Sequence, residues 1–117
     1  MNEAKILIVE DNLVIARSIR LILEQEGYTV CSIAISHEEA LEAVQKETPD
    51  IVLMDIDLKG IDGIHTAKIL KEQFDLKIIY CTDAADKHTF NIAKETFPAH
   101  YITKPFSNDE LLRAVAL

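Results

Sequence analysis

The stretch that decides the fold is Ile51-Val52-Leu53-Met54-Asp55, a run of four apolar residues that ends in an acid. An apolar run without alternation is typical of a strand that is buried on both faces of a parallel sheet. Short runs of a similar kind recur along the chain, and they cover residues 6–9, 28–34, 78–81 and 101–103. The second and the last of the five runs are more mixed, which suits positions near the sheet edges.

The segments between the runs have the periodicity of helices. The first carries an apolar stripe and is expected to end near Gly27; the stripe consists of Ile15, Ile19, Ile22 and Leu23. The second and fifth begin with capping-box spacing, at Ser36/Glu39 and at Ser107/Glu110. The third and fourth are marked by Ile64, Ala67, Leu70 and Phe74, and by Phe90, Ala93 and Phe97. This alternation predicts an α/β domain of (βα)5 type, a doubly wound five-stranded parallel sheet with helices on both faces.

Length and composition restrict the class of protein further. A chain of 117 residues, 49% of them hydrophobic, suits one domain, and we expect it to span residues 1–117, either as a minimal stand-alone domain or as a fragment of a longer protein. The net charge of −8 argues against nucleic acid as a partner of this domain, because binding to the phosphate backbone needs a basic face.

Apolar runs and cysteines bear on the compartment. Apolar stretches long enough to cross a membrane are missing from the sequence, and so is a signal peptide. Cys31 and Cys81 lie far apart, each within an apolar run, and predict buried free thiols in a reducing compartment. We therefore expect a cytoplasmic domain that does not associate with membranes.

Polar side chains follow four of the five apolar runs. Glu10 and Asp11 follow the first run, Asp55 the third, Thr82 the fourth and Lys104 the fifth. Ligands of open parallel sheets bind beyond the carboxyl ends of the strands, so we expect these side chains to meet at one rim.

The chemistry of these groups points to phosphoryl transfer. Two carboxylates such as Asp11 and Asp55 repel each other unless a cation lies between them, and Mg2+ prefers carboxylate and phosphate oxygens. The Lys104 ammonium and the Thr82 hydroxyl suit phosphoryl oxygens. Asp55 ends the central run and is the best placed nucleophile, which predicts an aspartyl phosphate.

Taken together, these motifs resemble those of the receiver domains of two-component response regulators. The matching pieces are Ile6-Leu-Ile-Val-Glu-Asp-Asn12, Ile51-Val-Leu-Met-Asp-Ile-Asp57, Asp62-Gly63, Thr82 and Lys104-Pro105-Phe106. The resemblance covers nearly the whole chain. It implies a flavodoxin-like or CheY-like sheet with the strand order 2-1-3-4-5.

The resemblance implies a signalling phosphoacceptor rather than an ordinary enzyme. Asp55 would take its phosphoryl group from a histidine kinase or a phosphotransfer protein. Mg2+ would be bound by Asp11, Asp55 and the backbone carbonyl of Asp57, with Glu10 acting mainly through metal-bound water.

The resemblance also implies a conformational switch. Thr82 and Lys104 would hold the phosphoryl oxygens, and Tyr101 would swing inward as Thr82 moves. The Lys104-Pro105 bond would be cis. The fourth helix, fifth strand and fifth helix would then form a surface that controls an output domain or partner and that can support a homodimer.

Two other functions remain open at this stage. Asp83, where receivers usually carry a small residue, and the unusual loop Leu58-Lys59-Gly60 favour a degenerate receiver that serves as a protein-interaction scaffold. Asp57, two residues after the nucleophile, would suit a Mg2+-dependent phosphatase, although no substrate cap is evident. The four histidines share no metal-ligand spacing and are predicted to lie at the surface; they are His37, His65, His88 and His100.

Overall fold

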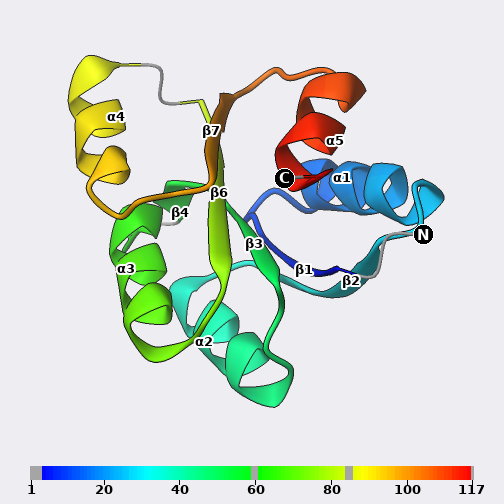
Figure 1. Ribbon diagram of the computed structural model, residues 1–117, viewed down its shortest axis with the longest axis horizontal. Helices are drawn as coiled ribbons and strands as arrows, with labels where there is room; N and C mark the ends of the chain where they lie inside the picture. Colours follow the sequence, from blue (N-terminus) through cyan, green and yellow to red (C-terminus); the bar gives the residue numbers. More distant parts are fainter. Residues whose placement is uncertain (1–3, 59–60, 84–85, 117) are drawn as a thin grey trace.

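Five parallel strands form the sheet in the computed structural model, which describes residues 4–58, 61–83 and 86–116. They are β1 (Lys5–Val9), β2 (Thr29–Ala34), β3 (Ile51–Met54), β6 (Lys77–Thr82) and β7 (His100–Thr103). Their order is β2-β1-β3-β6-β7, so the five predicted runs are arranged as 2-1-3-4-5, as expected (Figure 1). The two mixed runs, β2 and β7, are the edge strands.

Five helices cover the two faces of the sheet, as predicted. They are α1 (Leu13–Gln25), α2 (His37–Lys46), α3 (Gly63–Gln73), α4 (Lys87–Lys94) and α5 (Asn108–Ala116). Figure 1 shows α1 and α5 on one side of the sheet and α2 and α3 on the other. Successive residues of β3 alternate between the two cores: Val52 and Met54 pack toward α2 and α3, and Ile51 and Leu53 toward α1 and α5.

A short hairpin after β3 is absent from the sequence-based prediction. Strands β4 (Asp57–Leu58) and β5 (Ile61–Asp62) form an antiparallel pair, with Asp57 opposite Asp62. This hairpin connects β3 to α3. Lys59 and Gly60, which belong to the unusual loop noted in the sequence, lie outside the described residues.

The predicted helix ends are largely confirmed. Gly27 has a φ of 92° and ends α1 in a Schellman motif, in which the Gly27 and Tyr28 amides donate to the carbonyls of Glu24 and Leu23, both at 3.1 Å. At α5, Ser107 and Glu110 form a reciprocal capping box, with both hydrogen bonds at 3.1 Å. At α2, Ser36 caps the Glu39 amide, but the Glu39 carboxylate accepts from the Ile35 amide instead of that of Ser36.

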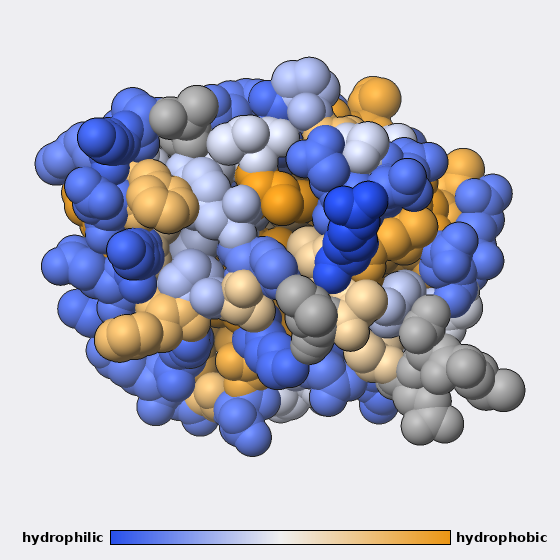
Figure 2. Space-filling view, turned by 45° about the horizontal axis from the view of Figure 1, so that its top comes forward, coloured by the Kyte–Doolittle hydropathy of each residue, from blue (hydrophilic) through white to orange (hydrophobic). Residues whose placement is uncertain are grey.

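The fourth helix is shorter and less buried than its apolar pattern predicted. Helix α4 ends at Lys94, and Ala93 is its one buried residue, whereas Phe90 is 40% and Phe97 82% exposed. Phe97 lies beyond the helix with a φ of 53°. The helical conformation is disfavoured there because Pro98 follows. Figure 2 shows apolar side chains at the molecular surface, on the side of the molecule where Figure 1 places α4.

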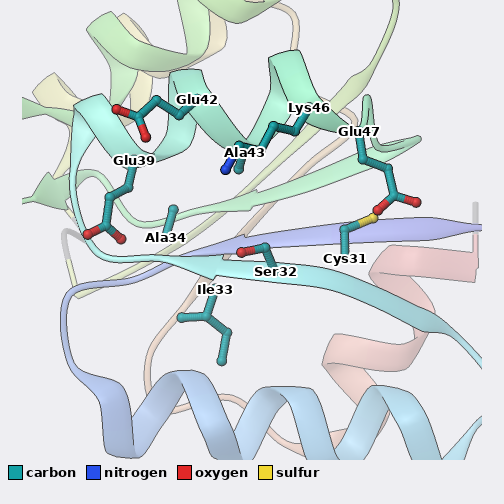
Figure 3. Close-up of a pocket in the computed structure, with 9 residues that line it drawn as sticks. All are labelled: Cys31, Ser32, Ile33, Ala34, Glu39, Glu42, Ala43, Lys46 and Glu47. Atoms are coloured by element: carbon teal, nitrogen blue, oxygen red, sulfur yellow. The ribbon is translucent and has the colours of Figure 1, made fainter.

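Two predictions of burial need correction. Cys81 is buried, but Cys31 is only partly buried because it lies on the edge strand β2; both thiols are free. Cys31 lines a shallow groove of about 310 Å³ between β2 and α2, and Figure 3 shows neighbouring Ile33 pointing away from that groove toward α1. His37 is not a simple surface residue: its Nδ1 lies 2.7 Å from the hydroxyl of buried Thr66.

Replacing Gly27 by alanine is expected to lower the free energy of unfolding by about 1 kcal/mol, because an L-residue is strained at positive φ. Urea unfolding of the two proteins measures the difference. Gly27→Asn is the matched control and should lose less, because asparagine tolerates this conformation better. Equal stability of wild type and Gly27→Ala would contradict the assignment of Gly27 as a helix terminator.

Candidate functional site

Three buried or nearly buried charged side chains meet at the carboxyl ends of the strands. Glu10 follows β1, Asp55 follows β3 and Lys104 follows β7; Glu10 and Asp55 are 3% and 6% exposed. The Lys104 ammonium donates to Glu10 Oε1 and lies 3.5 Å from Asp55 Oδ2. A single cation therefore bridges two buried carboxylates, which share no strand and lie far apart in the sequence.

Backbone hydrogen bonds just beyond the strands place these residues. The Glu10 amide donates to the Ala34 carbonyl at 2.9 Å, and the Asp55 amide donates to the Val9 carbonyl at 3.0 Å. The Lys104 amide donates to the Thr82 carbonyl at 2.8 Å. The sheet pairing thus extends by one residue at each of these strand ends. The Lys104-Pro105 bond is cis, as the sequence analysis expected.

Asp11 completes an oxygen-rich cluster beside this ion pair. One carboxylate oxygen each of Glu10, Asp11 and Asp55 lies within 4.8 Å of the other two. Carboxylate oxygens are the ligands that hard cations such as Mg2+ prefer, so the donor set fits this ion. Glu10 is already bonded to Lys104 and to the Asn12 amide, at 3.1 Å for the latter. This arrangement suits the predicted indirect role of Glu10 and leaves Asp11 and Asp55 as the direct carboxylate ligands that we predict.

The surroundings of Asp55 favour its protonated form in the absence of a metal. Burial raises the pKa of Asp55 to about 7, and the negative charge of Glu10 contributes to the rise. The Lys104 charge and the Asp57 amide, which donates to Asp55 Oδ1 at 3.3 Å, oppose it. Burial alone would lower the pKa of Lys104, but its hydrogen bond to Glu10 and the nearby acids outweigh burial and raise it. Lys104 therefore stays charged.

The two predicted switch residues lie on neighbouring strands. Thr82 is the last residue of β6, is fully buried and pairs with Thr103 of β7. Tyr101 is half-buried on β7, where its ring meets that of Phe90 edge to face at 5.1 Å and is tilted against that of Tyr80 at 6.0 Å. Tyr101 therefore connects the sheet to α4.

The remaining predicted residues lie near the cluster but outside it. The Asp57 side chain is exposed, and Asp57 contacts the Asp55 carboxylate through its amide. Its backbone carbonyl stays a predicted metal ligand. Asp83 is exposed, and its charge is among those that raise the pKa of Lys104.

Sequence reasoning missed two features of the site. One is the ion pair between Glu10 and Lys104, which are carried by strands that are not neighbours in the sheet. The other is the close approach of Gly63 to the backbone of Asp55 and Ile56, where its amide donates to the Ile56 carbonyl at 2.6 Å. The Asp62-Gly63 motif after Asp55 was a visible signal in the sequence. The sequence does not show which atoms surround Gly63 in the fold.

Comparison with known proteins decides the family. A family model described as the response regulator receiver domain matches residues 6–116. The chain belongs to the response regulator receiver family. Such domains are signalling phosphoacceptors, and the family works with histidine kinases and output domains. Among the described residues, no helix is long and apolar enough to cross a membrane.

Individual relatives agree with this assignment. The chain is 30% identical over 115 residues to a probable C4-dicarboxylate response regulator, DctR, of Bacillus subtilis; the match covers 97% of the chain and 51% of DctR. The chain thus spans about half the length of this curated relative. The signal receiver domain of a modulated diguanylate cyclase from Desulfovibrio desulfuricans is 37% identical, with a TM-score of 0.89 and coverage of 98% and 92% of the two chains. A CheY-like receiver domain protein from Methanospirillum hungatei is 29% identical, with the same TM-score and coverage.

The raised pKa of Asp55 predicts how the stability of the metal-free protein depends on pH. The folded state holds the Asp55 proton to a higher pH than the unfolded state, whose pKa is near 3.8, so stability falls as pH rises from about 4 to about 7. Asp55→Asn removes the buried negative charge of the ionised carboxylate. Its free energy of unfolding should exceed that of the wild type by about 2 kcal/mol near pH 8 in a chelator, and the difference should shrink toward pH 4. Urea unfolding across this pH range measures it. A gap that is constant with pH would contradict the raised pKa.

Proposed function

We propose that this domain is a phosphoacceptor of a two-component phosphorelay and that Asp55 receives the phosphoryl group. The observation that supports the proposal most strongly is the position of Asp55, a buried carboxylate with Lys104 at 3.5 Å and with two further carboxylates close by. A buried acid at a strand end is costly unless it is paired, so this arrangement points to a chemical role.

The transfer would proceed by nucleophilic attack. A carboxylate oxygen of Asp55 attacks the phosphorus of a phosphohistidine on a histidine kinase or phosphotransfer protein. The new P–O bond forms as the P–N bond breaks, and the electron pair of that bond returns to the imidazole of the donor. Lys104 would move from Glu10 to a phosphoryl oxygen, and the Thr82 hydroxyl would donate to another.

Asp11, Asp55 and the backbone carbonyl of Asp57 would hold Mg2+, with Glu10 acting through metal-bound water. When bound, the ion supplies positive charge that offsets the charge of the transferring phosphoryl group. Glu10, Asp11 and Asp55 form a cluster of three carboxylates, and among the described residues Lys104 is the cation paired with Glu10 and Asp55, so a second cation is electrostatically favoured at this site.

The phosphorylated domain would signal through the surface formed by α4, β7 and α5. Thr82 would move toward the phosphoryl group, and Tyr101 would follow it inward. Tyr101 already packs against Phe90 of α4, so its movement would change the contacts of that helix. An output domain, a separate partner or a second copy of the chain would read the change. The free thiols of Cys31 and Cys81 suit the reducing cytoplasm, which we propose as the compartment.

Phosphoryl transfer to Asp55 is tested with phosphoramidate, a small donor, in the presence of Mg2+. Intact mass should show the gain of one phosphoryl group in the wild type and none in Asp55→Asn. Asp57→Asn is the matched control: its side chain is exposed and its backbone carbonyl is retained, so it should still gain the group. No gain in the wild type, or an equal gain in Asp55→Asn, would exclude this acceptor.

A receiver that serves only as a scaffold is the second candidate, and the negative charge of Asp83 beside Lys104 favours it. If the domain is instead an active receiver, Asp83 only slows the approach of an anionic donor. Asp83→Asn should then speed phosphoryl uptake from phosphoramidate about two- to fivefold at low salt, and less at high salt.

The control for this experiment is Asp75→Asn, which removes an exposed charge near the opposite end of β6 and should leave the rate unchanged. An active wild type whose rate does not respond to Asp83→Asn would contradict the electrostatic role. The scaffold function would gain support if neither protein takes up a phosphoryl group.

A further inference from the structure

Helix α3 starts closer to the acceptor backbone than a side chain would allow. Gly63, its first residue, is buried, and its amide donates to the Ile56 carbonyl at 2.6 Å. A Cβ atom on Gly63 would overlap the carbonyl oxygen of Asp55 and lie 2.8 Å from the Cα of Ile56 and 2.9 Å from the carbonyl carbon of Asp55. All three are backbone atoms, which cannot rotate away as the end of a flexible side chain could.

Gly63 is required because there is no room for a side chain, not because of its backbone conformation. Among the described residues, Gly27 is the glycine with a positive φ, and a Cβ there would meet nothing within 4 Å. Gly63 has no such conformation, but its Cα faces the peptide that follows Asp55. The two glycines therefore offer a matched pair: one is required by backbone conformation far from the site, the other by contact with the acceptor.

Contacts with α2 and with the core also hold α3 in place, so that it cannot easily move away from the backbone of Asp55. Thr66, one turn after Gly63, is fully buried, and its hydroxyl lies 2.7 Å from His37 Nδ1 at the start of α2. The His65 ring stacks on the His37 ring at 5.9 Å. The core-facing residues Ala67 and Leu70 are fully buried. An added methyl group at Gly63 would therefore displace the acceptor segment at least as readily as the helix.

The segment around Asp55 makes contacts on both sides of this residue that a displacement would disturb. Its amide is bonded to the Val9 carbonyl at 3.0 Å, and its carbonyl faces Gly63. Beyond that carbonyl, the Asp57 amide donates to Asp55 Oδ1 at 3.3 Å. A turn of the peptide between Asp55 and Ile56 would re-aim both the carboxylate and this amide.

We propose that Gly63 is a positioning residue for phosphoryl transfer: its bare Cα lets α3 press against the peptide after Asp55 and so fixes the direction of the acceptor carboxylate. This inference rests on the proposed phosphoacceptor function of Asp55. Gly63 itself touches no reacting atom and acts through the acceptor backbone.

The test compares Gly63→Ala with Gly27→Ala. Phosphoryl uptake from phosphoramidate is measured at saturating donor and Mg2+, together with urea unfolding and the backbone amide resonance of Asp57. Gly63→Ala should lower the maximal uptake rate about 10- to 100-fold, because small displacements of reacting groups cost rate steeply, and should shift the Asp57 amide. Gly27→Ala should lose stability but keep the rate and the Asp57 resonance of the wild type.

The outcomes separate this proposal from the proposed function. If the wild type takes up no phosphoryl group, the proposed function fails. The positioning role is tested separately, because an unshifted Asp57 amide resonance in Gly63→Ala would overturn it whatever the wild type does. A Gly63→Ala protein that keeps both the wild-type rate and the wild-type Asp57 resonance would overturn the positioning role alone.

If Gly63→Ala does not fold, Thr66→Ala takes its place. Loss of the hydrogen bond to His37 loosens the start of α3 and should lower the maximal rate severalfold. Thr48→Ala is the control, because the hydroxyl of exposed Thr48 donates to the Val44 carbonyl at 3.1 Å just beyond the end of α2, outside the site. Equal rates for these two variants would overturn the proposal.

Discussion

The contact of the Lys104 ammonium with Glu10 and Asp55 is the interaction on which the site depends. Two buried carboxylates without a partner would cost several kcal/mol each in lost hydration. Lys104 offsets that cost, but only if the ends of β1, β3 and β7 lie at one rim. The register of the sheet provides this placement, since hydrogen bonds continue one residue past each of these strands. The fold and the chemistry are thus linked through the position of one cation.

Among the described residues, carboxylates outnumber cations at this rim. Lys104 pairs with Glu10 and Asp55, while Asp11 adds a third carboxylate to the cluster. Burial and the negative charge of Glu10 raise the pKa of Asp55 to about 7. A divalent cation would remove the surplus and keep Asp55 ionised as a nucleophile. In the proposed transfer Lys104 would leave Glu10 for a phosphoryl oxygen, and Glu10 would keep its hydrogen bond from the Asn12 amide.

Much of this arrangement could be predicted from the sequence, because it depends on periodic patterns. Buried strands such as Ile51–Met54 are apolar throughout, and the residues that follow them must meet at the carboxyl edge of a parallel sheet. The helix end at Gly27 and the capping box at Ser107 were predictable from local chemistry.

Other features depend on contacts that no local pattern encodes. The strands β4 and β5 have two residues each, which is too short for a periodic signal. Phe97 continues the apolar spacing of α4, yet the helix ends at Lys94 and the Phe97 ring is 82% exposed. The bond of His37 to Thr66 joins two helices, and the crowding at Gly63 comes from backbone atoms. Such contacts are set by the packing of the whole chain.

The position of a bound metal decides whether the carboxylates at this rim form a Mg2+ site. A crystal structure with Mg2+, accompanied by one with Mn2+ to identify the ion by anomalous scattering, would show which oxygens it contacts. We expect one Mg2+ with carboxylate oxygens of Asp11 and Asp55 at about 2.0–2.1 Å. An ion bound elsewhere, or none between these two carboxylates when Mg2+ is abundant, would contradict this expectation.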